Sequence, residues 1–194
     1  MRCSVVIPTL NRADVLGRTL AALGRQSLCA AVGARVPPPF EVIVVDNGSS
    51  DGTARAVAAL AAEFPVPLRY LRSSRERNAG AARNEGSRSA SGEYLVFLGD
   101  DTVPVPGFLE RHLAAHSLRK NRPAVAVIGH TAWPPDSAPT RFMKYVGEQG
   151  WQFGFALIDD PENVPFNFFY SSNISLARGL LTAEGGFDEE FPEC

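Results

Sequence analysis

The chain has 194 residues, of which 45% are hydrophobic and 21% are charged, a composition that indicates one folded domain and excludes general disorder. Its formal net charge of −2 provides no overall attraction to nucleic acid. The three cysteines, Cys3, Cys29 and Cys194, are odd in number and lack metal-ligand spacing, which favours reduced thiols over a disulfide framework. No stretch has the length of a transmembrane helix, and Pro8 and Asn11 interrupt any signal peptide. We therefore expect a cytosolic protein, or one held peripherally at the cytosolic face of a membrane through partners.

The chain begins with a strand and a helix. The apolar run over residues 3–7 predicts a buried strand that ends at Pro8, and Thr9 or Asn11 is expected to cap the helix that follows. The apolar face of that helix consists of three residues at helical spacing: Leu16, Leu20 and Leu23.

A second strand and helix follow a loop over residues 28–39. The strand covers 40–45 with Asp46 at its tip, and turn residues 47–52 supply a cap for a helix over 53–64. This helix is expected to bury Val57, Leu60, Ala61 and Phe64.

The same alternation continues to residue 128. The expected elements are a strand over 66–71, a helix over 79–90, a strand over 94–98, a helix over 106–120 and a strand over 124–128. Small residues in the segment 79–90 allow its helix to approach a sheet closely. The pattern predicts an α/β fold with a doubly wound, mostly parallel sheet flanked by helices.

Two adjacent carboxylates, Asp100 and Asp101, follow the strand over 94–98 directly. Ligands of open α/β sheets lie outside the carboxyl ends of the strands, and oxygen ligands of this kind suit Mg²⁺ or Mn²⁺. The alternative for this stretch alone is a solvated turn with a helix-capping Asp. Thr9 with Asn11, and Asp46, follow the other expected parallel strands, so the polar clusters converge on one sheet edge. This convergence indicates a nucleotide site with a divalent metal at one end.

Common alternatives lack their motifs. The sequence contains no G-x-G-x-x-G after its first strand, no G-x-x-x-x-G-K-[ST] and no G-x-S-x-G, which removes the main support for dinucleotide-binding, P-loop and serine hydrolase proteins. A phosphatase with an Asp nucleophile usually has that residue after the first strand, where this chain has Pro8 and Thr9.

Aromatic residues and prolines concentrate in the segment 131–170. Its aromatic residues are Trp133, Phe142, Tyr145, Trp151, Phe153, Phe155, Phe166, Phe168, Phe169 and Tyr170. We expect any one of these side chains to pack in the core. The alternative is that they line a binding site for a second ligand.

Six segments in order resemble family 2 glycosyltransferases with the GT-A fold. They are residues 4–12 (SVVIPTLNR), 41–53 (EVIVVDNGSSDGT), 77–84 (RNAGAARN), 94–104 (YLVFLGDDTVP), 173–176 (NISL) and 185–189 (GGFDE). Together they cover nearly the whole chain and are far more specific than any one alone. The resemblance implies a single GT-A domain over 1–194, with a nucleotide-sugar-binding half over 1–130 and an acceptor-side segment over 131–194.

The resemblance also implies a nucleotide-diphosphate-sugar donor and an Mg²⁺ or Mn²⁺ ion that neutralises the departing diphosphate. The metal ligand implied is Asp101. The donor-binding residues implied are Pro8, Thr9, Asn11, Asp46, Asn78, Arg83 and Asp100. Gly99 stands where the family's motif often has its first Asp, so Asp100 takes over the ribose contact or that contact is absent. The acceptor is a saccharide, a lipid-linked sugar or a protein.

A second departure concerns the general base. Inverting members of the family use a Glu-Asp pair a little beyond the segment that matches 185–189, and the sequence ends about where that pair is expected. We therefore expect a C-terminal truncation with the base beyond Cys194. The alternatives within the sequence are Asp188, Glu189, Glu190 and Glu193.

Three hypotheses follow for the function. The first is an inverting, metal-dependent glycosyltransferase. The second is a non-catalytic nucleotide-sugar-binding module. The third is a sugar nucleotidyltransferase, which usually needs a Gly- and Lys-rich phosphate loop that residues 8–12 do not supply.

Overall fold

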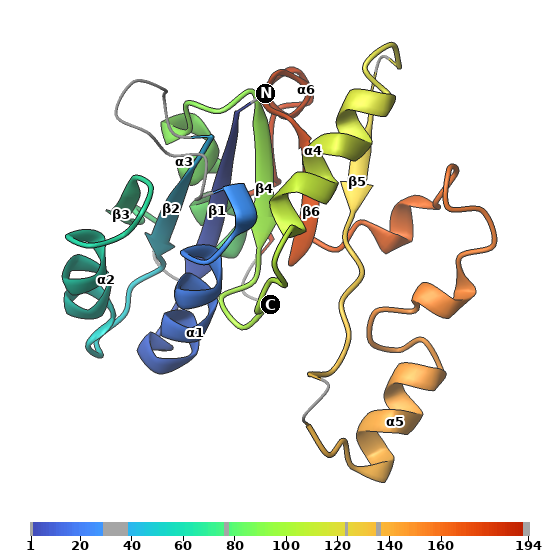
Figure 1. The fold of residues 1–194 in the computed structure, drawn as a ribbon, viewed down its shortest axis with the longest axis horizontal. Helices are drawn as coiled ribbons and strands as arrows, with labels where there is room; N and C mark the ends of the chain where they lie inside the picture. The colour runs from blue at the N-terminus through green and yellow to red at the C-terminus, as the bar shows by residue number, and fades with distance from the viewer. Residues whose placement is uncertain (1, 29–38, 76–77, 123, 135–136, 192–194) are drawn as a thin grey trace.

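The structure is a computed structural model that describes residues 2–28, 39–75, 78–122, 124–134 and 137–191 (Figure 1). Most of the expected loop over 28–39 lies outside these residues, as do Cys29, Arg77, Glu193 and Cys194.

The fold is built on a six-stranded sheet with the order β3-β2-β1-β4-β6-β5. Its strands are β1 (Cys3–Thr9), β2 (Phe40–Asp46), β3 (Leu68–Arg72), β4 (Tyr94–Leu98), β5 (Ala126–Ile128) and β6 (Asn173–Ala177). The first four in sequence are parallel neighbours, whereas β6 runs antiparallel between β4 and β5. The predicted α/β fold with a mostly parallel sheet is confirmed, and β6 is an addition that the sequence analysis did not predict.

Helices cover both faces of the sheet (Figure 1). Side chains of α1 (Ala13–Leu23), α2 (Thr53–Ala61) and α4 (Phe108–Leu118) pack in one apolar cluster with one face of the strands. Side chains of α3 (Ala79–Ser89) and α6 (Arg178–Ala183) pack in the cluster on the opposite face. Because both faces are covered, β1, β2 and β4 consist almost entirely of buried residues.

Two predictions at the first strand are wrong. Pro8 does not end β1 but pairs with Val45 of β2 inside the strand. The carbonyl of Thr9 faces β2, so the nitrogen of Pro8 faces the β4 side, where the ladder has already ended at Val6. The missing N–H therefore breaks no bond. Neither Thr9 nor Asn11 caps α1, because the amide of Ala13 donates to Asp51 instead.

The second helix is shorter than predicted. It ends at Ala61, and the side chain of Leu60 is 39% exposed instead of buried. Val57 is fully buried, as expected, and Phe64 packs from beyond the helix end as a partly buried neighbour of the core. The other elements for which bounds were predicted, β1 to β5, α3 and α4, lie within two residues of their predicted starts and ends, whereas α5 (Arg141–Glu148) and α6 were not predicted.

Most of the predicted aromatic core in the segment 131–170 is not core. Only Phe168 is buried among its ten aromatic residues. Figure 1 shows α5 (Arg141–Glu148) and the loops that follow it set apart from the sheet, beyond β5. Phe153, Phe155 and Tyr170 contact one another instead of the sheet, with ring centroids 5.2 to 6.0 Å apart. No helix in the described ranges is long and apolar enough to cross a membrane.

Replacing two helix glycines with alanine is expected to change the free energy of unfolding in opposite directions. A Cβ on Gly86 of α3 would lie 2.4 Å from Cγ1 of Val6 and 3.1 Å from Cγ2 of Val45, whereas a Cβ on Gly17 of α1 meets nothing within 4 Å. We expect Gly86→Ala to lower the free energy of unfolding by about 2 kcal/mol through overpacking. Gly17→Ala is expected to raise it by about 0.5 to 1 kcal/mol through the unfolded state. Urea unfolding of both variants checks this, and equal effects would contradict the close packing of α3.

Candidate functional site

The carboxyl ends of β1, β2 and β4 meet at one edge of the sheet. Thr9, at the end of β1, donates its hydroxyl proton to Oδ2 of Asp100 at 2.8 Å. The carbonyl of Thr9 accepts from the amide of Asn47, which follows β2, at 2.8 Å. The polar residues that follow three separate strands are thus linked directly, as the sequence predicts for parallel neighbours.

Asp100 is the buried member of the adjacent carboxylates. Its side chain is 7% exposed, compared with 53% for Asp101. Its backbone is held by the hydroxyl of Thr19 in α1, which donates to the carbonyl of Asp100 at 2.8 Å. Burial raises the pKa of the Asp100 carboxyl, although the hydrogen bond from Thr9 and the nearby charge of Arg12 oppose that rise. Asp100 is therefore fixed in place, and Asp101 faces solvent.

Arg12 joins the two carboxylates. Its Nη1 lies 2.9 Å from Oδ1 of Asp100, and its Nη2 lies 3.1 Å from Oδ2 of Asp101. No role was predicted for Arg12 from the sequence. Two sequence features could have predicted this contact. Two adjacent carboxylates need a cation nearby, and Arg12 lies three residues after the tip of another strand.

Asp46 lies at the tip of β2 and is almost fully buried. Its Oδ1 accepts from the amides of Gly48 and Ser49 at 3.1 and 2.7 Å, and its Oδ2 accepts from the hydroxyl of Tyr70 at 2.6 Å. Burial, and then the carboxylate of Asp46, raise the pKa of Tyr70 to about 12, so this phenol stays a donor. Tyr70 of β3 is a second residue of this edge to which the sequence analysis gave no role.

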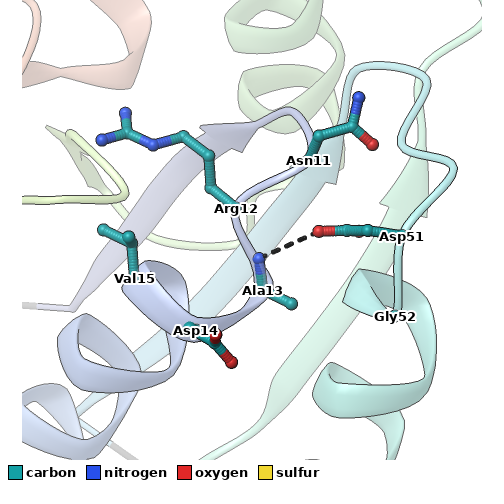
Figure 2. Close-up of a pocket in the computed structure, with 7 residues that line it drawn as sticks. All are labelled: Asn11, Arg12, Ala13, Asp14, Val15, Asp51 and Gly52. Carbon is teal, nitrogen blue, oxygen red and sulfur yellow. Dashed lines mark hydrogen bonds between the residues drawn. The ribbon is translucent and has the colours of Figure 1, made fainter.

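Asn11 ties together the turns after β1 and β2. Its Oδ1 accepts from the amide of Ser50 at 2.8 Å, and its own amide donates to Oγ of Ser49 at 2.8 Å. Its φ of 52° is a left-handed conformation, which Asn tolerates better than most residues. Beside it lies an open depression of about 440 Å³, shown in Figure 2. Its lining consists of Asn11, Arg12, Ala13, Asp14, Val15, Asp51 and Gly52.

Asn78 connects the strand edge to α3. Its amide donates to Oδ1 of Asn47 at 3.1 Å, and its own Oδ1 caps the helix by accepting from Ala81 at 2.7 Å. Its Nδ2 donates to the carbonyl of Glu189 at 2.8 Å. Asn78 therefore lies between the residues that follow β2 and the C-terminal segment.

Arg83 lies further along α3 and contacts the C-terminal segment. Its guanidinium carbon is 5.6 Å from the ring centroid of Phe187, and its Nη1 donates to the carbonyl of Ala79 at 3.2 Å. Neither of these two contacts joins Arg83 to the linked group of Thr9, Arg12 and Asp100.

Two of the candidate general bases within the sequence, Asp188 and Glu189, are engaged in local contacts. Oε1 of Glu189 accepts from Nδ2 of Asn84 at 2.8 Å, and its Oε2 lies 3.1 Å from Nη1 of Arg75. The hydrogen bond from Asn84 and the contact with Arg75 hold the pKa of Glu189 below its usual value. Oδ1 of Asp188 accepts from the amide of Glu190 at 2.8 Å. Both residues shape the segment that packs over α3.

The carboxylates at the end of β4 fit a hard divalent cation. Among the described residues, no group of three or more His, Cys, Asp or Glu side chains forms a closed metal cage. Mg²⁺, however, is commonly held by one or two carboxylates together with substrate phosphates and water. Asp100 and Asp101 supply such carboxylates, and a guanidinium cation already lies against them. The donor set therefore suits a metal that binds together with a phosphorylated ligand.

These features define an α/β protein with a polar site at the carboxyl edge of a mostly parallel sheet. The family model for glycosyl transferase family 2 matches residues 4–177. The chain therefore belongs to this family, as its motifs indicate.

Relatives and solved structures agree with this assignment. The chain is 32% identical to the validoxylamine A glucosyltransferase of Streptomyces hygroscopicus subsp. limoneus, over 97% of this chain and 44% of that protein. It is 28% identical to a chondroitin synthase of Escherichia coli, over 97% of this chain and 30% of that protein. The chain thus spans less than half the length of these relatives.

Two solved structures share the fold. A mannosyltransferase of Pyrobaculum calidifontis, in complex with GDP-Man and Mn²⁺, superposes with a TM-score of 0.72 at 24% identity, covering 97% of this chain and 48% of that one. Staphylococcus aureus TarS in complex with UDP gives a TM-score of 0.72 at 20% identity, covering 99% of this chain and 52% of that one. These likenesses confirm the GT-A fold.

Proposed function

We propose that the protein transfers a sugar from a nucleotide-diphosphate-sugar donor to an acceptor hydroxyl, with inversion and with a divalent metal. The observation that carries this proposal is the linked arrangement of Thr9, Asp100 and Asp101 beside Asp46 at one sheet edge. Two relatives of the chain are named as a validoxylamine A glucosyltransferase and a chondroitin synthase, and two fold neighbours are in complex with GDP-Man and Mn²⁺ or with UDP. Residues 1–130 form the donor half in this proposal, and residues 131–194 border the acceptor.

The donor site in this proposal consists of Pro8, Thr9, Asn11, Asp46, Asn78, Arg83 and Asp100. Asp46 faces the nucleoside, because its carboxylate lies at the strand tip beside the turn over 47–52. Asn78 lies beside the same turn through its bond to Asn47. Arg83 stands at the outer border, where it also contacts Phe187.

Asp101 is the metal ligand in this proposal, with Asp100 beside it. When bound, Mg²⁺ or Mn²⁺ supplies Lewis-acid neutralisation of the diphosphate that leaves the sugar. The chain's own contribution is geometric: Thr9 and Thr19 hold Asp100, and through it the neighbouring Asp101, at the sheet edge.

The general base stays a prediction. A base must accept a proton from the acceptor hydroxyl, and a carboxylate whose pKa is held low accepts one poorly. The contacts with Asn84 and Arg75 hold the pKa of Glu189 low. We therefore propose that Glu189 positions the C-terminal segment and is not the base.

Calorimetric titration with UDP, GDP, dTDP and CDP, with and without Mn²⁺, tests the proposal. We expect one nucleoside diphosphate to bind, and to need Mn²⁺ for high affinity. Metal-independent binding of all four, or no binding of any, would contradict the proposed donor site. Release of the nucleoside diphosphate during turnover distinguishes glycosyl transfer from nucleotidyl transfer, which would release pyrophosphate.

Asp46→Asn tests the nucleoside contact. Asn keeps an acceptor for Gly48 and Ser49 but loses the charge and the second oxygen, which accepts from Tyr70, and a hydrogen bond to a charged group is worth roughly 1.5 to 3 kcal/mol. We therefore expect the affinity for the preferred nucleoside diphosphate to fall by about 10-fold or more. The exposed carboxylate of Glu63 provides the control, Glu63→Gln, which should bind as the unmodified protein does. Unchanged affinity of Asp46→Asn would remove Asp46 from the site.

A further inference from the structure

Arg12 lies against both of the carboxylates that are proposed to meet the metal. It uses two separate nitrogens, one for Oδ1 of Asp100 and one for Oδ2 of Asp101, at 2.9 and 3.1 Å. The guanidinium therefore bridges both side chains and balances one of their two negative charges. A divalent cation that approaches Asp101 meets both the reduced negative charge and the repulsion of this guanidinium.

The three side chains differ in their freedom to move. Asp100 is 7% exposed and is tied to Thr9, so its position is fixed by the sheet. Arg12 is 44% exposed and precedes α1 as its N-terminal flanking residue, so its long side chain is able to reorient without disturbing the core. If the bridge opens, it is Arg12 that moves.

A diphosphate offers Arg12 a better partner. Guanidinium groups bind phosphate oxygens with two parallel hydrogen bonds, and such charge-assisted bonds are among the strongest in proteins. The depression beside Arg12 is lined by Asn11, the start of α1 and the turn at Asp51 and Gly52, and it offers this exposed side chain open space (Figure 2).

We propose that Arg12 is a built-in counter-cation, which neutralises Asp100 and Asp101 in the free protein and moves to the diphosphate when donor binds. This inference rests on the proposed function. Metal and nucleotide then bind cooperatively, because the nucleotide removes the cation that competes with the metal. In the free protein the metal binds weakly, which limits occupation of the site in the absence of donor.

The affinity of the protein for Mn²⁺ alone tests this role directly, by calorimetry or by the electron paramagnetic resonance signal of free Mn²⁺. Arg12→Gln removes the competing charge and is expected to bind Mn²⁺ about 10-fold more tightly, since a neighbouring charge of this kind shifts carboxylate equilibria by roughly 1 to 3 decades. Arg12→Lys keeps the charge but lacks the fork that reaches both carboxylates, and it should lie in between. Arg18→Gln is the matched control, because Arg18 is exposed on α1, the helix that Arg12 precedes, and the change in net charge is the same. It should bind Mn²⁺ within about twofold of the unmodified protein.

Cooperativity gives a second readout. With saturating UDP or GDP, the gain in Mn²⁺ affinity should be smaller in Arg12→Gln than in the unmodified protein, because the competitor is already absent. Equal or weaker Mn²⁺ binding by Arg12→Gln, with Mn²⁺ still bound by the unmodified protein, would overturn the counter-cation role alone. No Mn²⁺ binding by any of these proteins, with or without UDP and GDP, would overturn the metal site and this role together. The thermal unfolding of each variant shows that it is folded.

Discussion

Asp101→Asn is expected to lower the Mn²⁺-dependent affinity for a nucleoside diphosphate by at least about 100-fold. Changes in residues that merely support a metal ligand commonly reduce metal affinity by 10- to 100-fold, so loss of the ligand's own charge should exceed that range. Asp101 is 53% exposed and forms its described ion pair with Arg12 only, so Asn at this position should leave the folded state intact. The effect is therefore separable from stability.

Glu93→Gln is the matched control for this measurement. Glu93 is an exposed carboxylate at the opposite end of the same strand, directly before Tyr94, and its change removes the same charge. Titrating both variants with UDP and GDP in the presence of Mn²⁺ checks the prediction. If Asp101→Asn retains the Mn²⁺ dependence of the unmodified protein, the metal is held elsewhere and the assignment of Asp101 fails.

The central strands were predictable because the helices on both faces of the sheet require an almost continuous run of apolar residues in each strand. The run at residues 94–98 is apolar throughout and that at 40–45 is apolar apart from Glu41, as expected for strands covered on both faces, and polar residues begin where each strand meets the ligand edge. The convergence of Thr9, Asp46 and Asp100 on one edge follows from parallel pairing, so it too was predictable.

The features that the sequence did not predict depend on partners far along the chain. Arg12 and Asp100 are 88 residues apart, and no local pattern shows that they meet. Whether Pro8 breaks a strand depends on where the neighbouring ladder ends, which is set by β4. The antiparallel β6 returns to the sheet after a long excursion, and its direction is decided by that path.

The aromatic residues of the segment 131–170 show a limit of another kind. The presence of an aromatic residue in the sequence does not show whether its side chain is buried or exposed. Its exposure depends on which other residues pack against it. Phe166 is 91% exposed and Phe168, two residues later, is 6% exposed. The alternative of a binding wall stays a prediction for the exposed members.

Two buried histidines between α4 and β6 predict how the stability of the fold depends on pH. His112 and His116 of α4 both face Ser175 of β6, whose Oγ lies 2.7 Å from Nδ1 of His112 and 2.9 Å from Nε2 of His116. Nε2 of His112 lies 3.2 Å from Oδ1 of Asn173. The hydroxyl of Ser175 donates to only one of the two rings, so the other ring must donate its N–H to Ser175. This network works with neutral rings.

Burial keeps His112 neutral to low pH. Desolvation lowers its pKa from 6.5 to about 4, although the bond to Asn173 favours the charged form, and His116 has a pKa lowered mainly by burial as well. In the unfolded chain His112 takes up a proton near pH 6.5. The free energy of unfolding is therefore unaffected by protonation of His112 above pH 6.5, and it falls as the pH is lowered toward 4. For His112 alone the loss amounts to about 3 kcal/mol between pH 7 and pH 4.

Comparison with His112→Gln isolates this contribution from the carboxylates that also titrate in this range. We expect His112→Gln to be less stable than the unmodified protein at pH 7, since Gln fills the site less well. Its deficit should shrink by about 3 kcal/mol as the pH falls to 4, because Gln takes up no proton in the unfolded state. Urea unfolding at half-unit pH steps measures both curves, with His130→Gln, at an exposed position, as the control. Parallel curves for His112→Gln and the unmodified protein would show that His112 binds its proton equally in both states, and that the buried ring does not set the acid limit of this fold.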